Sequence, residues 1–219
     1  MAKASLVVLI SGSGSNLQAI IDAIENKELD AEIKAVISNT ATALGLERAA
    51  RANIETHVVD HKQYSDRESF DRAMMHIIEP LEPDLVVLAG FMRILSDTFI
   101  DRYQHRLINI HPSLLPKYKG LNTHQQALDN KDAIHGASVH FVSHELDSGP
   151  VVIQAEIPVL DTDTSASLGA RVLNEEHVIY PMVIGMHTAG RLTFKGDQLN
   201  LDEKPLTEPL IWKNQHLSR

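Results

Sequence analysis

The 219-residue sequence contains no cysteine, which excludes disulfide bonds, zinc sites built on thiolates and a cysteine nucleophile. It has no apolar run that approaches the roughly 18 residues of a membrane span. The apolar stretch at residues 6–10 is also too short for a signal peptide. We therefore expect a soluble, cytoplasmic protein without a membrane partner.

Basic residues are also scarce. Lysine and arginine total 20 against 29 aspartates and glutamates, which gives a formal net charge of −9. Proteins that bind nucleic acids normally carry a basic stripe, so we expect no nucleic-acid partner. The composition still permits a local basic pocket for a small anion.

Short apolar, β-branched runs alternate with segments of helical periodicity through the first half of the chain. Strands are predicted at residues 6–10, 33–38, 56–59, 84–89 and 107–110. Helices are predicted at residues 16–26, 43–52 and 65–79. Such alternation is typical of a parallel sheet with right-handed crossovers.

The pattern changes after residue 120. Residues 136–142 and 151–160 read as two strands joined by a turn, which indicates an antiparallel pair. Helices are predicted at residues 122–130 and 168–188, and Pro181 would kink or divide the second helix. A short last strand is predicted at residues 191–194.

We therefore predict an α/β fold, with a Rossmann-like, mostly parallel twisted sheet flanked by helices and an antiparallel excursion in the C-terminal half. Residues 1–120 would form a Rossmann-like half with a substrate-phosphate loop, and residues 121–194 would complete the catalytic site. Residues 195–219 would form a polar C-terminal tail, in which two prolines disfavour a long helix.

The predicted strand at residues 107–110 ends in the sequence Asn109-Ile110-His111, followed by a loop bracketed by prolines. Strand side chains alternate between faces, so Asn109 and His111 point to the same side. An amide donor beside an imidazole that holds or gives a proton is what acyl-type transfer needs at a developing oxyanion. This strand end is therefore a candidate catalytic site.

The glycine-rich turn at residues 11–16 joins the first predicted strand to the first helix, where backbone N–H groups can hold an anion. It lacks the lysine of a P-loop. It also lacks the third glycine of a dinucleotide site, and the second strand ends in Ser38-Asn39-Thr40 rather than in an acid. A monophosphate on a small substrate fits better than a nucleotide cofactor, and a plain tight turn is the alternative.

Asp147 lies in the turn between the two later strands. It is either a solvated turn residue or a carboxylate that faces His111 and favours its charged form, and spacing alone does not decide between them. His135, His140 and His144 lack the spacing of a zinc site, so no metal is expected.

Four segments in order make the sequence similar to the phosphoribosylglycinamide formyltransferases, the folate-dependent GAR transformylases of purine synthesis. The resemblance covers about residues 5–194. Its motifs are ISGSGSNLQ at 10–18, VLAGFMRIL at 87–95, NIHPSLLP at 109–116, and GASVHFV at 136–142 running on to DSGP at 147–150.

This resemblance implies formyl transfer from 10-formyltetrahydrofolate, a cosubstrate rather than a tightly bound cofactor, to the amino group of N1-(5-phosphoribosyl)glycinamide. The amine would attack directly, through a tetrahedral intermediate. The implied catalytic residues are Asn109, His111 and Asp147. The implied substrate-binding residues are Gly14, Ser15, Asn16, Leu173, Asn174, Glu175 and Glu176. The implied folate-binding residues are Arg67, Met92, Arg93, Ile94, Leu95, Asn109, Ser143, His144, Glu145, Leu146 and Asp147.

The expected partners are these small molecules alone, and the expected assembly is a monomer or weak homodimer. Three alternatives stay open. A methionyl-tRNA formyltransferase shares the HPSLLP motif but carries a further C-terminal domain and a basic surface for tRNA. A formyltetrahydrofolate hydrolase would use the same three catalytic residue types on water, usually behind an N-terminal regulatory domain. A nucleotide-binding or sensor module would have kept the pocket and lost the activity.

Overall fold

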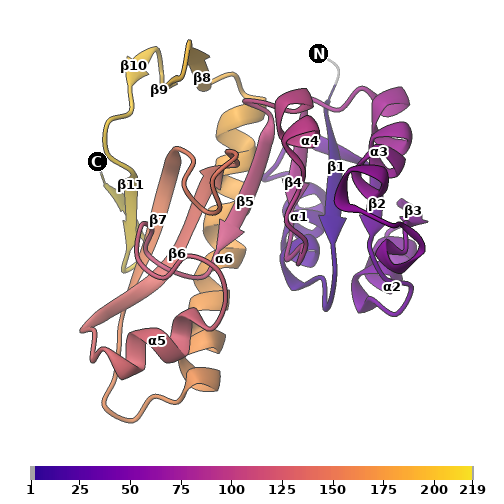
Figure 1. Cartoon of the computed structure of the whole chain (residues 1–219). Helices are drawn as coiled ribbons and strands as arrows, with labels where there is room; N and C mark the ends of the chain where they lie inside the picture. The colour runs from indigo at the N-terminus through magenta and orange to yellow at the C-terminus, as the bar shows by residue number, and fades with distance from the viewer. Residues whose placement is uncertain (1–2, 219) are drawn as a thin grey trace. The chain divides into compact units, whose positions relative to one another are not determined.

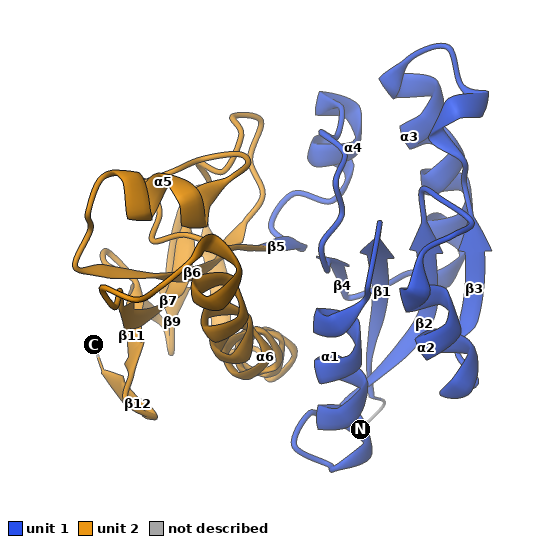
Figure 2. Cartoon of the chain, turned by 90° about the horizontal axis from the view of Figure 1, so that it is seen from below, with its two compact units in different colours: residues 1–109 blue, residues 110–219 orange. Residues whose placement is uncertain are grey.

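The computed structural model describes residues 3–218. The chain divides between Asn109 and Ile110 into two compact units, which Figure 2 shows in separate colours. Within residues 3–218, no helix combines the length and the apolar character that crossing a membrane requires.

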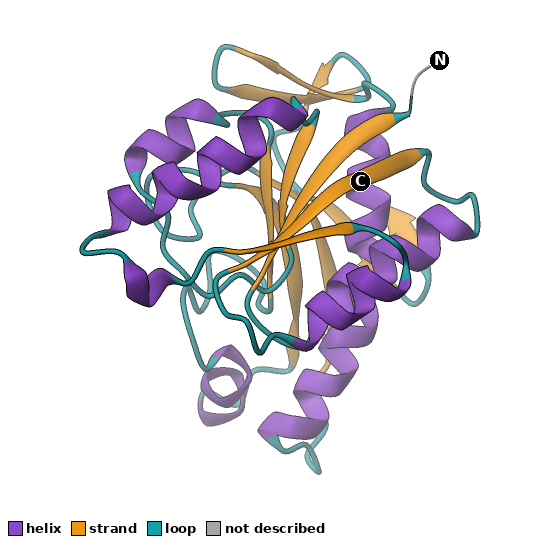
Figure 3. Cartoon of the chain, turned by 90° about the vertical axis from the view of Figure 1, so that its right-hand side faces the viewer, coloured by secondary structure: helices purple, strands orange, loops and turns teal. Residues whose placement is uncertain are grey.

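The first unit is built on a parallel sheet with the strand order β5-β4-β1-β2-β3 (Figure 1). Each strand is joined to the next through a connection that contains a helix (Figure 3). The elements are β1 Ala4–Ile10, α1 Ser15–Glu25, β2 Ala31–Ser38, α2 Leu44–Arg51, β3 Glu55–Val58, η1 His61–Gln63, α3 Arg67–Ile78, η2 Glu79–Leu81, β4 Leu85–Leu88, α4 Asp97–Arg102 and β5 Leu107–His111, whose last two residues belong to the second unit.

The central strands of this unit are apolar along their length because helices cover the sheet. In β1, residues 6–10 are fully buried, and β4 is buried throughout, as expected for a parallel sheet covered on both faces. Helix α1 contacts α2, and α3 contacts α4; the two pairs lie on opposite sides of the strands in Figure 2. The predicted parallel, helix-flanked sheet is therefore confirmed.

The order of the strands places two loops side by side. Strand β1 pairs in parallel with β2 on one side and with β4 on the other. The strands after β1 are therefore added first on one side of it and, from β4 on, on the opposite side. In such sheets, ligands bind outside the carboxyl ends of the strands at this switch point. The loops that follow β1 and β4 carry the predicted phosphate motif and one of the predicted folate segments.

The second unit contains an antiparallel pair of strands, β6 and β7, with the long helix α6 packed on them (Figure 1). The antiparallel pairing confirms the predicted excursion. Strand β11 extends the sheet beside β7 in parallel, and β12 pairs antiparallel with β11. The elements are α5 Thr123–Asp129, β6 Ile134–Phe141, β7 Val151–Pro158, α6 Ser165–Thr188, β8 Leu192–Lys195, β9 Gln198–Leu201, β10 Lys204–Pro205, β11 Leu210–Lys213 and β12 His216–Ser218.

Helix α6 is continuous through Pro181, so the predicted division of this helix is wrong. A proline removes one backbone hydrogen bond and strains the preceding turn. Buried side chains on both sides of it, among them Ile179, Tyr180, Val183 and Ile184, hold the helix against its surroundings. Tertiary packing therefore outweighs the local effect of the proline.

Two features were not predicted. Helix α4 is short, and its N-cap is Ser96, whose hydroxyl accepts a hydrogen bond from the Phe99 N–H at 3.4 Å. The segment after residue 195, predicted as a polar tail, also forms strands: β9 and β10 make a small antiparallel sheet with β8, which is the predicted last strand at residues 191–194. The reason is a sparse set of buried apolar residues in a polar sequence, Leu199, Leu201, Leu206 and Leu210.

A hydrogen bond links strand β11 to α6: Trp212 Nε1 donates to Oε2 of Glu175 at 2.7 Å. We expect Trp212→Phe, which keeps an aromatic ring but removes the donor, to lower the free energy of unfolding by about 1–2 kcal/mol, because the acceptor is charged. Urea denaturation measures this loss. The control is Lys213→Met, which removes an ion pair with Glu156 whose lysine is 46% exposed; it should cost less than about 1 kcal/mol. Equal losses in both variants would contradict this assignment.

Candidate active site

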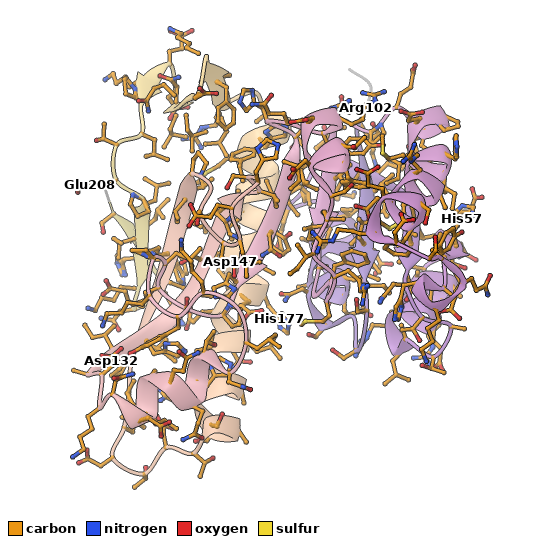
Figure 4. All side chains as sticks on the ribbon, viewed as in Figure 1. His57, Arg102, Asp132, Asp147, His177 and Glu208 are labelled. Carbon is orange, nitrogen blue, oxygen red and sulfur yellow. The ribbon has the colours of Figure 1, made fainter. Side chains whose placement is uncertain are left out.

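The second unit brings His111 and Asp147 together. His111 ends β5 and is 5% exposed. Its Nδ1 lies 3.4 Å from Oδ2 of Asp147. Asp147, labelled in Figure 4, belongs to the loop between β6 and β7 and has a left-handed backbone, with φ 48°. Of the two interpretations of this aspartate, the carboxylate that faces His111 is the one that matches the geometry, since its side chain is only 8% exposed.

The other ring nitrogen of His111 also meets an acceptor. Nε2 lies 2.8 Å from the backbone carbonyl oxygen of Tyr118. A carbonyl only accepts, so Nε2 carries a proton in this arrangement. The Asp147 carboxylate on the opposite side of the ring is likewise an acceptor when ionised. Both nitrogens therefore face acceptors, which is the environment that a doubly protonated imidazole requires.

The segment that supplies the Tyr118 carbonyl is tied to the loop that supplies Asp147. The Gly120 N–H donates to Asp147 Oδ2 at 2.9 Å. Lys119 Nζ lies 3.1 Å from Oε1 of Glu145 and also contacts Ser148 Oγ. The lysine lowers the pKa of the exposed Glu145 carboxyl. Both acceptors of the His111 ring thus come from segments that hold each other in place.

His140 lies behind the Asp147 carboxylate. Its Nε2 is 3.8 Å from Asp147 Oδ1, and its Nδ1 lies 3.0 Å from the Phe141 carbonyl oxygen, to which it donates. The residue is almost completely buried, and burial lowers its pKa. A histidine kept neutral here adds no positive charge that would compete with His111 for Asp147.

Asn109 lies two residues before His111 on β5 and is half-buried. It pairs with Leu88 of β4 in the parallel register. Alternation along the strand places Asn109 and His111 on one face of β5, and Ile110 points away.

The predicted phosphate loop lies in the first unit. Gly14 has φ 68°, and a Cβ atom on it would lie 2.5 Å from the Cα of Gly45 in α2. Arg48, also in α2, donates from Nε to the Ser13 carbonyl oxygen at 2.9 Å. The loop is therefore packed closely against α2. Asn16, in the first turn of α1, is buried.

The predicted folate residues of the first unit lie on a loop and on a helix. Met92, Arg93 and Ile94 are exposed, whereas Leu95 is buried. The Met92 N–H donates to the Ser11 hydroxyl at 2.8 Å, so the loops after β1 and β4 are in contact. Arg67 is the first residue of α3 and is exposed.

The predicted folate loop of the second unit is mostly exposed. Ser143 Oγ donates to the Glu145 carbonyl oxygen at 3.1 Å, which closes a local turn. His144, Glu145 and Leu146 are exposed, and Asp147 alone turns its side chain inward.

The predicted substrate residues of α6 point in different directions. Glu176 is buried and Asn174 is exposed. Leu173 is half-buried. Glu175, predicted to bind substrate, accepts the hydrogen bond of Trp212. Its carboxylate is therefore engaged with strand β11.

Two further histidines form a pair in this unit. His124 Nδ1 lies 3.0 Å from Nε2 of His135. Burial, reinforced by His124, lowers the pKa of His135 to about 4. Across residues 3–218, no group of three His, Cys, Asp or Glu side chains is arranged to hold a metal ion.

Sequence reasoning missed the backbone groups that complete the site. The Tyr118 carbonyl and the Gly120 N–H carry no side-chain signal, and Arg48 acts on a loop that lies far from it in the sequence. The one available signal was Gly120, which lies after the proline-bracketed loop, since a glycine in a connecting segment often marks a backbone conformation with positive φ; here φ is 80°.

Several known proteins are similar to this chain. A family model described as formyl transferase matches residues 4–184. A phosphoribosylglycinamide formyltransferase of Escherichia coli (strain K12) is 53% identical over 202 residues, which cover 92% of this chain and 95% of that protein. The trifunctional purine biosynthetic protein adenosine-3 of Homo sapiens is 46% identical over 188 residues, which cover 86% of this chain and 19% of the human protein.

Among solved structures, the phosphoribosylglycinamide formyltransferase of Coxiella burnetii superposes with a TM-score of 0.90 at 50% sequence identity, covering 94% of this chain and 96% of that chain. Identity at this level over nearly the whole of both chains confirms the resemblance seen in the sequence motifs. The chain belongs to the formyl transferase family and, within it, to the phosphoribosylglycinamide formyltransferases.

Proposed function

We propose that this chain transfers the formyl group of 10-formyltetrahydrofolate to the amino group of N1-(5-phosphoribosyl)glycinamide, a step of purine synthesis. The observation that carries this proposal is the His111 ring, buried between the Asp147 carboxylate and the Tyr118 carbonyl, in a chain of this family. The formyl-folate is a cosubstrate, and no resident cofactor is needed.

In the proposed reaction, the neutral substrate amine attacks the formyl carbon. A C–N bond forms, and the carbonyl π electrons move to oxygen. His111 donates a hydrogen bond to this oxyanion from Nε2, which exchanges the Tyr118 carbonyl for the reacting oxygen, while Asp147 keeps its place at Nδ1. Asn109 donates its amide to the same oxygen. Donors of this kind are usually the largest single contribution to acyl-transfer catalysis.

Collapse of the tetrahedral intermediate re-forms the C=O bond and breaks the bond between the formyl carbon and N10 of the folate. The attacking nitrogen loses one proton, which Asp147 or a water held by it accepts, and this proton is passed on to N10 as the bond to the formyl carbon breaks. Every electron pair and proton is accounted for without a covalent enzyme intermediate, in agreement with the absence of cysteine.

The remaining predicted residues are proposed to bind the two small molecules. Gly14, Ser15 and Asn16 at the start of α1 bind the substrate phosphate, because a helix N-terminus offers N–H groups and a favourable dipole. The buried Glu176 is the polar contact of the α6 stretch 173–176. The folate is assigned to Arg67, residues 92–95 and residues 143–147.

One assay separates this function from its alternatives. Purified protein is incubated with 10-formyltetrahydrofolate, with and without N1-(5-phosphoribosyl)glycinamide, and folate turnover is followed by absorbance. We expect turnover that requires the amine and yields formylated product. Turnover that ignores the amine would indicate a hydrolase, and binding without turnover would indicate a sensor module.

Asn16 tests the assignment of the phosphate loop. If its buried amide contacts the phosphate, Asn16→Ala should weaken binding of the phosphorylated substrate by about 1.5–3 kcal/mol, the range for hydrogen bonds to charged groups. Folate binding should hardly change. Calorimetry measures both affinities, and Ser13→Ala, an exposed position in the same loop, is the control. Equal losses for substrate and folate would mean that the loop is misassigned.

A further inference from the structure

The segment Met92–Leu95 is held at both ends by side chains from other parts of the first unit. At its start, the Met92 N–H donates to Ser11 Oγ at 2.8 Å. Immediately after its end, the Ser96 N–H donates to Oδ2 of Asp71 at 2.5 Å. Asp71 belongs to α3, so the second contact joins this helix to the point where α4 begins.

The carboxyl group of Asp71 lies in an environment that is unusual for an ionisable side chain. The residue is 1% exposed, and its Oδ1 has no hydrogen-bond partner within residues 3–218. Burial raises the pKa of this carboxyl, while the Ser96 contact and the charges of Arg67 and Arg93 oppose the increase. Burying a carboxylate with one oxygen unsatisfied costs stability, so stability does not account for an aspartate here.

The Asp71 contact has a clear local consequence. Ser96 is itself buried and caps α4, so anchoring its N–H fixes the backbone where the segment ends. Between the two anchors, Met92 is 67% exposed and Ile94 is 56% exposed. Large apolar side chains on an exposed loop lose less conformational entropy on binding when both ends of the loop are fixed beforehand.

The two arginines add an electrostatic part. Arg67 is one helical turn before Asp71 on α3, and Arg93 lies inside the anchored segment. Both are exposed, and both act electrostatically on the buried carboxylate. The Asp71 side chain therefore fixes the backbone at the end of the segment and also interacts electrostatically with Arg67 and Arg93.

We propose that Asp71 is a positioning residue for the formyl-folate: it holds Met92–Leu95, and with it Arg67 and Arg93, in the arrangement that binds this cosubstrate, without touching it. This inference rests on the proposed function, because it takes the folate as the ligand of the segment.

The test is Asp71→Asn, which retains an oxygen that can accept the Ser96 N–H but removes the charge. We expect the KM for 10-formyltetrahydrofolate to rise about tenfold, the effect of turning one charge-assisted hydrogen bond into a neutral one. The KM for the amine substrate should stay within about twofold, and the Tm within a few degrees, because the substitution also removes a buried charge. Asp97→Asn, an exposed acid in the first turn of α4, is the matched control and should leave both KM values unchanged.

An unchanged folate KM in Asp71→Asn would overturn the proposal. So would an increase in both KM values together with a large fall in Tm, since that result describes a residue needed only for folding. If the unaltered protein shows no amine-dependent transfer, the proposed function fails instead, and the two failures are thereby distinguished.

A second measurement needs no variant. The Ser96 amide should exchange its hydrogen slowly in the unaltered protein, because its N–H is buried and bonded to a carboxylate. Exchange as fast as in an unstructured loop would mean that the anchor does not exist in solution, and the proposal would fall.

Discussion

His111→Ala is expected to lower kcat for formyl transfer by about 10³-fold or more. The imidazole supplies a hydrogen bond to the oxyanion, worth about 10²–10³-fold, and it also holds a proton during the reaction, which typically contributes about 10²–10⁴-fold. The two contributions come from one ring and are not simply multiplied. Steady-state assays with both substrates saturating measure the loss.

A matched histidine provides the control. His57, labelled in Figure 4, lies on β3 and pairs with Glu55 at 3.1 Å, outside every segment assigned to the site. His57→Ala should change kcat by less than about twofold, because the residue lies in no segment assigned to the site. Calorimetry should show that His111→Ala still binds both small molecules. A His111→Ala enzyme that keeps a tenth or more of its kcat would contradict the proposed role.

The sequence predicted most of the first unit because its signals are local. Strands β1 and β4 are continuous apolar runs, and α1 shows an apolar face at helical spacing with Leu17, Ile20 and Ile21 buried. The parallel topology then follows from alternation alone. Some predicted element ends are wrong by one or two residues: β2, for example, begins at Ala31 rather than at residue 33. Differences of this size are usual, because helix and strand ends are not sharply defined.

The rest depends on contacts between residues that are far apart in the chain. Strand β11 forms by pairing with the edge of β7. The four residues of β11 contain no pattern that identifies β7 as their partner. The same holds for the site: the residue types at 109, 111 and 147 could be predicted, but the distance between His111 and Asp147 required the fold. Backbone groups such as the Tyr118 carbonyl are invisible to any pattern of side chains.

Asp147→Asn is expected to lower kcat by about 10²-fold or more, the size of a general acid–base contribution. Two N–H groups point at the Asp147 oxygen Oδ2: that of Gly120 at 2.9 Å and, when it is protonated, Nδ1 of His111. The amide oxygen of asparagine has two lone pairs and can still accept from both donors, but the amide supplies no negative charge. The protonated ring therefore loses its counter-ion, although the shape of the side chain is kept.

The control for Asp147→Asn is Asp129→Asn, an exposed position on α5, which should leave kcat within about twofold. A kcat of Asp147→Asn within about threefold of the unaltered enzyme would contradict the pairing. The double variant gives the sharper result. If Asp147 acts through His111, removing the carboxylate from an enzyme that already lacks the imidazole should cost little more, because residues that act as a unit are strongly non-additive. If the two losses multiply instead, the two groups act independently, and the 3.4 Å contact between them has no part in the catalytic step.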